Sequence, residues 1–161
     1  MAYREFTKKE KDILDELTED FRSKIVPVAS KVNELCTDED CSVRIQSGYR
    51  STKDQLKHYK VGRKKRGDKW VRTGDRPVIT YAKPGHSPHE YRLAVHIVLL
   101  NDNDRRWLSD KDERWHTIVG KTVREAGGLT WGGDFSKIFD AAHVEDPKWR
   151  DVARDLDWRG L

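Results

Sequence analysis

Long apolar runs and leader-like features are missing from this chain of 161 residues. The longest apolar run, residues 93–100, is interrupted by His96 and is far shorter than the roughly 18 residues that a membrane-spanning helix needs, so we expect no membrane span. No apolar segment with a small-residue cleavage site follows the charged N-terminus, so we expect no secretory signal peptide. The chain is therefore expected to be synthesised in the cytoplasm.

Cysteine is scarce, being limited to Cys36 and Cys41 on either side of an acidic turn. Two cysteines exclude a disulfide-dense scaffold, and their spacing is not that of a zinc-cysteine site. A disulfide that closes the small loop and a pair of free thiols both remain open. Synthesis in the cytoplasm favours the free thiols.

Charge of one sign is in small excess, and the excess is confined to one segment. The formal net charge is +4, from 32 basic and 28 acidic residues. Between Lys60 and Arg72 seven basic residues stand against one acid, a local charge of +6, so the rest of the chain is slightly acidic. This distribution argues against a general nucleic-acid coat, and the few aromatic residues near the segment argue against a base-stacking platform. We expect nucleic acid not to be the partner.

The first half of the chain predicts helices around one short strand. A capping box at Thr7 and an apolar stripe from Ile13 to Ile25 predict an amphipathic helix from about residue 8. Pro27 is expected to end or restart this helix, which then continues to Cys36. Further on we expect a strand at 42–46, a helix at 53–59 and an irregular surface loop at 60–77.

The second half predicts short strands around one helix. Residues 93–100 contain too many apolar residues in a row for a half-exposed strand, so this strand is expected at the centre of a sheet. Other predicted elements are strands at 78–81, 129–131 and 142–145, a helix from 109 that stops at Gly127, and a final helix at 149–158. The length favours one domain over residues 1–161. The predicted fold is α+β, with N-terminal helices packed on a small, mainly antiparallel sheet.

Histidines carry the candidate chemistry. His58 and His116 lie in predicted helices and are expected to be solvated surface residues. His96 is costly to bury in an apolar strand unless a partner satisfies it, and a metal ion shared with nearby His89 is one such partner. His143 follows Asp140 by three residues, a spacing at which the carboxylate can hold a water beside a metal. From spacing alone, core histidines with ordinary hydrogen-bond partners are the commoner case, and a zinc site is the less frequent alternative.

Three separated stretches, covering about residues 42–146, together resemble one enzyme family. They are SGYRS at 47–51 with Gln55, the run VITYAKPGHSPH at 78–89, and WGGD at 131–134 followed by DAAHVE at 140–145. The sequence is similar to the VanY-like zinc D-alanyl-D-alanine carboxypeptidases and L-alanyl-D-glutamate endopeptidases, which share a fold with the Hedgehog signalling domain. The resemblance implies that fold and a zinc-dependent peptidase.

The resemblance also implies a ligand set and a base. His89 and His143 match two zinc ligands of the family, and Asp140 matches its general base. The sequence departs from the family pattern at two positions, because His96 replaces the usual aspartate ligand and Arg92 replaces a glycine. Neutral imidazole is a competent zinc ligand, so the implied cofactor is one Zn²⁺ held by His89, His96 and His143.

Further residues take roles only through the resemblance. Arg50 matches an arginine that neutralises the developing oxyanion, a role that suits a permanent cation. Ser87 and Gln55 are implied to orient the substrate or to support the site. Without the resemblance, a surface salt bridge for Arg50 and a turn-capping hydroxyl for Ser87 are the simpler interpretations.

The implied reaction is hydrolysis of the L-Ala–D-Glu amide in the peptidoglycan stem peptide. The residues of the motif at 78–89 and the expected lack of a secretory signal peptide favour a phage endolysin that is made in the host cytoplasm and acts on the cell wall after release. About fifteen residues follow Glu145, so we expect no separate wall-binding domain. Alternatives are a D-Ala-D-Ala carboxypeptidase and a non-catalytic metal-binding variant of the same fold. We expect a monomer. For the segment Lys60–Arg72, a solvated loop at the rim of the cleft and electrostatic contact with the anionic cell envelope are equally open interpretations.

Overall fold

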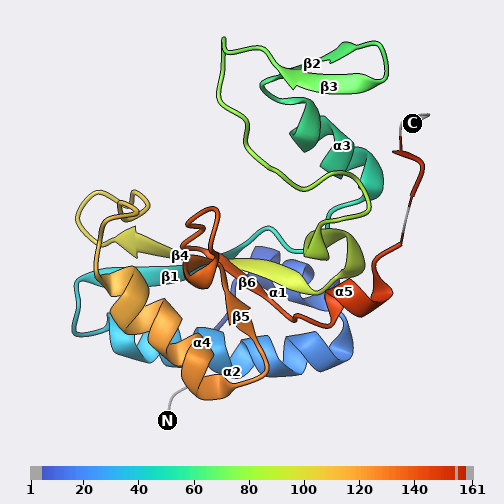
Figure 1. Ribbon diagram of the computed structural model, residues 1–161. Coiled ribbons are helices and arrows are strands. Elements are labelled where there is room, and N and C mark those ends of the chain that lie inside the picture. Colours follow the sequence, from blue (N-terminus) through green and yellow to red (C-terminus); the bar gives the residue numbers. More distant parts are fainter. Residues whose placement is uncertain (1–4, 155, 159–161) are drawn as a thin grey trace.

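The structure, a computed structural model, describes residues 5–154 and 156–158 (Figure 1). Helices and strands follow one another as α1 (Lys8–Asp15), α2 (Glu19–Cys36), β1 (Cys41–Gln46), α3 (Thr52–Lys60), β2 (Arg63–Arg66), β3 (Lys69–Arg72), β4 (Ala94–Asn101), α4 (Lys121–Ala126), β5 (Thr130–Trp131), β6 (His143–Glu145) and α5 (Trp149–Val152). Short 3-10 turns at Pro88–Tyr91 and Gly132–Asp134 and a π-helical turn at Trp115–Gly120 complete the order. In this described part no helix is long and apolar enough to cross a membrane.

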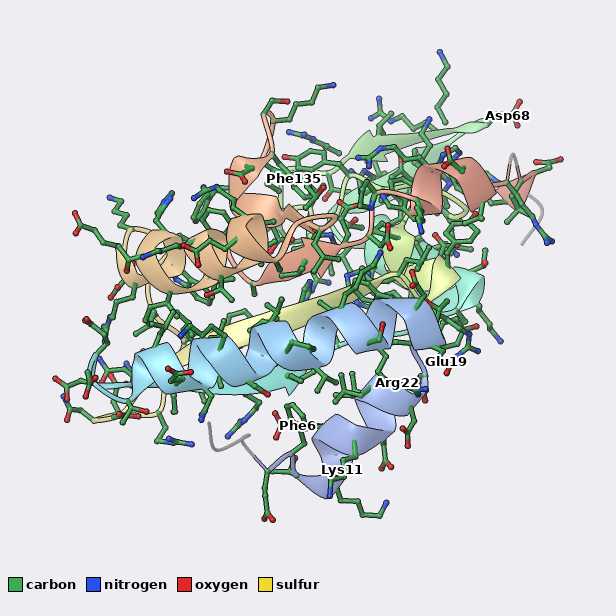
Figure 2. All side chains as sticks on the ribbon, turned by 90° about the horizontal axis from the view of Figure 1, so that it is seen from below. Phe6, Lys11, Glu19, Arg22, Asp68 and Phe135 are labelled. Atoms are coloured by element: carbon green, nitrogen blue, oxygen red, sulfur yellow. The ribbon has the colours of Figure 1, made fainter. Side chains whose placement is uncertain are left out.

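A four-stranded antiparallel sheet organises the domain. Its strand order is β1-β4-β6-β5, so β4 pairs on both sides and is central, as predicted. Four consecutive residues of β4, Ile97 to Leu100, are at most 3% exposed. Helices α2 and α4 pack side by side and cover one face of the sheet (Figures 1 and 2). The predicted α+β class with helices packed on a small antiparallel sheet is confirmed.

The N-terminal helical region breaks earlier than predicted. The capping box at Thr7 begins α1, which ends at Asp15, and a second helix starts after Thr18, whose hydroxyl accepts from the backbone N–H of Phe21. The Thr18 N–H donates to the Arg92 carbonyl, so a long-range bond stabilises the break. Pro27 neither ends nor restarts a helix but lies inside α2. The local cap therefore decides the boundary, and tertiary packing offsets the cost of proline.

The prediction of an irregular loop over residues 60–77 is only partly correct. They contain an antiparallel hairpin, β2–β3, in which Arg66 pairs with Lys69 around a two-residue turn, Gly67-Asp68. Gly67 adopts a φ of 59°, a conformation that tight hairpin turns require and glycine adopts without strain. Dense charge concealed the strands, because the short segments show no alternation of apolar and polar residues.

Three other predicted elements are wrong or shorter than expected. The helix predicted from residue 109 begins only with the π-helical turn at Trp115. Residues 78–81 form no strand. The Thr80 carbonyl accepts from Arg63 of β2, and Gln55 of α3 donates to the carbonyl of the neighbouring Ala82. The final helix extends only over Trp149–Val152, while residue 155 lies outside the described residues. Cys36 and Cys41 are both buried free thiols, in agreement with the favoured prediction, and burial raises the pKa of each.

Candidate active site

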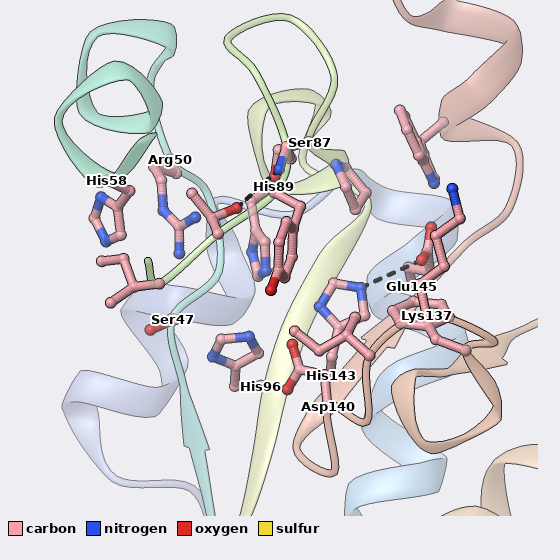
Figure 3. Close-up of a pocket in the computed structure, with 18 of the residues that line it drawn as sticks. Ser47, Arg50, His58, Ser87, His89, His96, Lys137, Asp140, His143 and Glu145 are labelled. Carbon is pink, nitrogen blue, oxygen red and sulfur yellow. Dashed lines mark hydrogen bonds and ion pairs between the residues drawn. The ribbon is translucent and has the colours of Figure 1, made fainter. Parts of the chain in front are cut away.

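An open cleft of about 860 Å³ lies where β4 and β6 meet the loops around them (Figure 3). Its floor is made by three histidines, and its walls come from the segment 79–82, the loop 135–138 and α3. Apolar side chains stand exposed on both walls, with Ile79 and Tyr81 each 56% exposed on one and Ile138 43% exposed on the other. The cleft is therefore polar at its floor and apolar at its rim.

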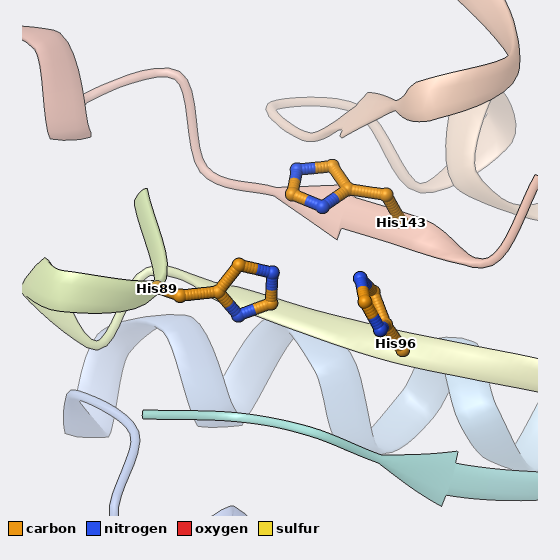
Figure 4. A group of neighbouring side chains, drawn as sticks. All are labelled: His89, His96 and His143. Atoms are coloured by element: carbon orange, nitrogen blue, oxygen red, sulfur yellow. The ribbon is translucent and has the colours of Figure 1, made fainter. Parts of the chain in front are cut away.

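His89, His96 and His143 are brought together at the floor (Figure 4). Each offers one nitrogen, and these three atoms lie within 4.8 Å of one another. His96 and His143 are direct register partners in β4 and β6, so their side chains share one face of the sheet. His89 comes from the 3-10 turn that precedes β4. The remaining histidine of this stretch, His86, is exposed and outside the group.

His89 is fixed by a hydrogen bond on one side of its ring. Its Nδ1 lies 2.8 Å from the Gly48 carbonyl oxygen, which can only accept, so Nδ1 carries the proton and Nε2 is left as a lone pair. The side chain is 3% exposed, and burial lowers its pKa well below the usual histidine range. This is the neutral tautomer that a metal ligand requires.

His143 faces a buried carboxylate on the side away from the other histidines. Its Nε2 lies 3.4 Å from Glu145 Oε1 but has no hydrogen bond, and Glu145 Oε2 also lacks one among the described residues. Figure 3 shows the other ring nitrogen on the side of His89 and His96. Glu145 is only 2% exposed, and Arg150 Nη1 lies 3.7 Å from its second oxygen. A carboxylate behind a ligand in this way orients the ring and raises its basicity.

His96 takes the place of the family's aspartate. Its backbone N–H donates to the Ser47 carbonyl, while burial, together with the nearby charges of His143 and Arg50, lowers the side-chain pKa to about 3. The ring is thus neutral near pH 7. Three converging imidazole nitrogens, from the buried His89 and His143 and the partly buried His96, fit a divalent ion of the borderline type, such as Zn²⁺, and the set leaves room for an additional ligand.

Asp140 lies beside the histidines and lines the cleft (Figure 3). Burial raises its carboxyl pKa, opposed by His143 and Arg50. Its position is set by a tight turn, in which the Asp140 N–H donates to the Gly132 carbonyl and the His143 N–H donates to the Asp140 carbonyl. A carboxyl group whose pKa is raised towards the working pH is suited to accept and return a proton.

Arg50 reaches into the cleft from the start of the α3 region. Its Nη1 donates to Gln55 Oε1 at 2.9 Å, and its backbone N–H donates to the His89 carbonyl. Gln55 is fully buried, and its amide nitrogen donates to the Ala82 carbonyl at 2.8 Å. Of the two roles open to Gln55, these contacts favour support of Arg50 over direct contact with substrate.

Ser87 lies on the cleft wall and is 3% exposed. The loop that carries it is held by Glu90, which accepts from the backbone N–H groups of Gly85 and Ser87. Arg92, where the family has glycine, adopts a left-handed φ of 62°. Its guanidinium turns away from the cleft and lies 3.9 Å from the Tyr49 ring centroid, so the bulky replacement leaves the floor open.

Two cleft residues were missed from the sequence. His58 was interpreted as a solvated residue, but it is partly buried and lines the cleft three residues after Gln55 on α3. Glu145 was given no role, although the i, i+2 spacing from His143 in a strand already places both side chains on one face. The predicted roles of His89, His96, His143, Asp140, Arg50, Ser87 and Gln55 stay predictions that this geometry supports.

The small antiparallel sheet and the three-histidine cluster beside a carboxylate are the features of a metallohydrolase. The family model described as D-alanyl-D-alanine carboxypeptidase matches residues 80–146. The chain is also 30% identical over 124 residues to the peptidoglycan L-alanyl-D-glutamate endopeptidase CwlK of Bacillus subtilis (strain 168), across 73% of this chain and 68% of that relative. The chain therefore belongs to the peptidase family whose model is described as D-alanyl-D-alanine carboxypeptidase, and it is a metallopeptidase.

A solved structure supports the fold independently. The L-Ala D-Glu endopeptidase ChiX of Serratia marcescens superposes with a TM-score of 0.58 at 18% identity, covering 95% of this chain and 96% of that one. At this identity the match concerns the arrangement of elements only. It shows that almost the whole of this chain follows the fold of a known peptidase.

Proposed function

We propose that the protein is a zinc-dependent peptidase that hydrolyses the L-Ala–D-Glu amide of the peptidoglycan stem peptide. The observation that carries the proposal is the cluster of His89, His96 and His143 on the floor of a cleft that Asp140 and Arg50 also line. Similarity to relatives that bear the same activity in their names supports the choice of bond.

The histidines would hold the ion, and the other residues handle protons and charge. A bound zinc ion supplies Lewis-acid chemistry, which favours attack by water on an amide carbonyl. Asp140 accepts a proton from the attacking water at its carboxylate oxygen and then donates it to the nitrogen of the leaving amine. Its raised pKa favours uptake of the proton from water and still allows its return to the leaving amine.

Arg50 compensates the charge that develops on the carbonyl oxygen. A guanidinium keeps its proton even when burial lowers its pKa, as it does here, so Arg50 remains a cation in the cleft. The bond from Arg50 to Gln55 fixes the position of that charge before the substrate arrives. A fixed cation loses little energy to reorganisation during the reaction.

Walls on both sides of the floor favour an endopeptidase. Exposed apolar side chains on 79–81 and 135–138 offer contacts to residues on either side of the scissile amide. One alternative is a D-Ala-D-Ala carboxypeptidase, which removes a single terminal residue and so needs extended contacts on only one side of the scissile amide. The other alternative is a non-catalytic metal-binding variant in which His96 has replaced the usual carboxylate ligand.

The biological setting is also our proposal. A phage endolysin that accumulates in the host cytoplasm, reaches the wall after release and acts as a monomer is consistent with the peptidase family. If this is so, the protein expressed inside bacterial cells should leave them intact until the membrane is permeabilised, and lysis should follow within minutes. Lysis without permeabilisation would contradict the release step.

Defined muropeptides test the reaction itself. Purified protein loaded with one equivalent of zinc should release products with new L-Ala carboxyl and D-Glu amino termini, measured by mass spectrometry, and a chelator should abolish the release. Loss of only a terminal D-alanine would establish the carboxypeptidase instead. Stoichiometric zinc binding without any hydrolysis would establish the non-catalytic variant.

A further inference from the structure

We propose that one face of the β2–β3 hairpin binds a phosphodiester polymer of the bacterial wall and so holds the cleft against its substrate. The face, called the outer face below, comprises Lys64, Arg66, Lys69 and Val71. The inference rests on the proposed action on the wall, but it concerns a surface that takes no part in the chemistry.

Strand register divides the hairpin into two faces. Residues directly opposite each other share a face, and so do alternate residues along a strand. The pairs Arg63–Arg72 and Lys65–Trp70 therefore lie on the inner face, and the pairs Lys64–Val71 and Arg66–Lys69 lie on the outer face. Each face thus carries three of the six cations in the two strands.

Contacts with the body of the protein occupy the inner face. Arg63 Nη1 donates to the carbonyls of Tyr59 and Thr80, at 2.7 and 3.0 Å, and its guanidinium lies 4.0 Å from the Tyr59 ring centroid. Trp70 packs against the cluster formed by α3 and Trp158. These contacts turn Arg63 and the only aromatic residue of the hairpin, Trp70, towards α3, whereas Lys65 and Arg72 stay exposed at the edges of the inner face.

The outer face is left to solvent. Lys64, Arg66 and Lys69 are all exposed, and none of them forms an ion pair with a carboxylate among the described residues. Arg66 and Lys69 are direct cross-strand neighbours, an arrangement of like charges that destabilises a hairpin. Figure 1 shows the hairpin on the far side of α3 from the four-stranded sheet, and Figure 2 shows Asp68, its one acid, at the outer end. An anionic partner would offset the repulsion.

The chemistry of the face favours phosphate over other anions. Two of its three cations are lysines. A lysine presents a compact charge that suits a single phosphate oxygen, whereas bidentate pairing with a carboxylate is typical of arginine. A phosphodiester keeps its charge at every physiological pH, whereas many stem-peptide carboxylates are accompanied by amino groups. Nucleic acid shares the phosphodiester but needs aromatic platforms for single strands, and Trp70 is on the other face.

The hairpin is also joined to the wall of the cleft. Arg63 binds the Thr80 carbonyl, and the Arg72 guanidinium lies 5.6 Å from the ring centroid of Tyr81, whose side chain lines the cleft. A polymer bound on the outer face would consequently lie close to the cleft rim, because the segment 79–82 joins the hairpin to that rim. Binding there raises the local concentration of substrate without altering the catalytic residues.

A cosedimentation experiment tests the proposal with the full chain. The triple variant Lys64→Gln, Arg66→Gln, Lys69→Gln is compared with wild type and with a control, Lys9→Gln, Lys11→Gln, Lys121→Gln, which loses the same charge from the exposed surfaces of α1 and α4. Each protein is incubated with insoluble walls, either intact or stripped of phosphodiester polymers by mild acid, over a range of salt concentrations. Hydrolysis of a soluble muropeptide is measured in parallel.

We expect the outer-face variant to bind intact walls about tenfold more weakly than wild type at low salt, and to match wild type at high salt, because screening removes surface attraction. The control should bind within about twofold of wild type, and stripped walls should bind all three proteins equally weakly. Soluble muropeptide should be cleaved by all three at the same rate.

Other outcomes would overturn the proposal. Equal binding of the outer-face variant and the control to intact walls would show that only net charge matters. Unchanged binding to stripped walls would exclude the phosphodiester polymer, and tighter binding to duplex DNA than to intact walls would assign the face to nucleic acid. Failure of wild type to cleave soluble muropeptide would contradict the proposed reaction alone, since wall binding is scored separately.

Discussion

The four-stranded sheet and the β2–β3 hairpin place functional side chains in opposite environments. The sheet buries or partly buries its histidines in and beside the largely apolar strand β4, where each polar atom needs a defined partner. The hairpin exposes most of its cations, and among the described residues none forms an ion pair with Lys64, Arg66 or Lys69 of the outer face. The function of the histidine cluster depends on the exact positions of its atoms, whereas that of the outer face depends mainly on its net charge. Substitutions should therefore separate the two regions cleanly.

The largest effect is expected for Asp140→Asn in the sheet region. Loss of the proton acceptor should reduce hydrolysis of soluble muropeptide by about 10²–10⁴-fold, the usual contribution of a general acid–base group. Zinc content, measured by atomic absorption, should stay at that of wild type. The matched control is Asp134→Asn, which removes an exposed carboxylate paired with Arg124 and should leave the rate unchanged. A fully active Asp140→Asn protein would remove Asp140 from the mechanism.

Gly132→Ala should break the same region sterically. A Cβ at this position would overlap the Asp140 carbonyl oxygen and lie 2.9 Å from His143 Cβ, so the turn that places both residues must shift. Overpacking of this kind costs about 1–3 kcal/mol or more in the free energy of unfolding. Thermal unfolding measures that loss, and zinc affinity should fall with it. An unchanged melting temperature would mean that the turn is freely deformable.

Glu145→Ala should weaken metal binding more selectively. Removal of a carboxylate behind a ligand typically costs about 10–100-fold in metal affinity. Competition with a chelator gives the affinity, and imidazole ¹⁵N NMR of the metal-free protein shows whether the His143 proton leaves Nε2. Glu145→Gln, which keeps an acceptor oxygen but loses the charge, should fall between wild type and Glu145→Ala. Equal affinity in all three proteins would show that Glu145 does not position His143.

The smallest effect is expected in the hairpin. Gly67→Ala meets no atom within 4 Å, so its only cost is the positive φ of 59°, about 1 kcal/mol. The melting temperature should fall by several degrees at most. Cleavage of soluble muropeptide should not change, because no cleft residue moves. A loss of that activity would couple the hairpin to the chemistry and contradict the separation of the two regions.

Fold class and the central strand were accessible from the sequence because they depend on long apolar patterns. The run from residue 93 to 100 cannot be exposed on either side, so its place in the sheet followed directly. Elements decided by single bonds to residues far away in the sequence were not accessible in the same way. The helix break at Thr18 depends partly on a bond to Arg92, 74 residues further on, and the segment 78–81 is held by side chains instead of a neighbouring strand.

The candidate site was accessible to a different degree. Motif spacing identified every residue of the histidine cluster, although only the register of β4 with β6 places His96 opposite His143. The contribution of α3 was not foreseen, because His58 has no neighbours in sequence that distinguish it from a surface histidine. The hairpin was missed since four charged residues in a row give no periodic signal, while the turn residues Gly67-Asp68 were the one available indication.

At the proposed metal site, the pairing of His96 with His143 would link metal binding to correct folding. A shift of β6 by one residue would turn His143 to the opposite face of the sheet, where it could not share an ion with His96. An ion that binds only the native register stabilises that register over every slipped one, by a free energy that grows with the logarithm of its concentration. The metal would thus favour the correct alignment of β6, whose pairings with β4 and β5 are only three and two residues long.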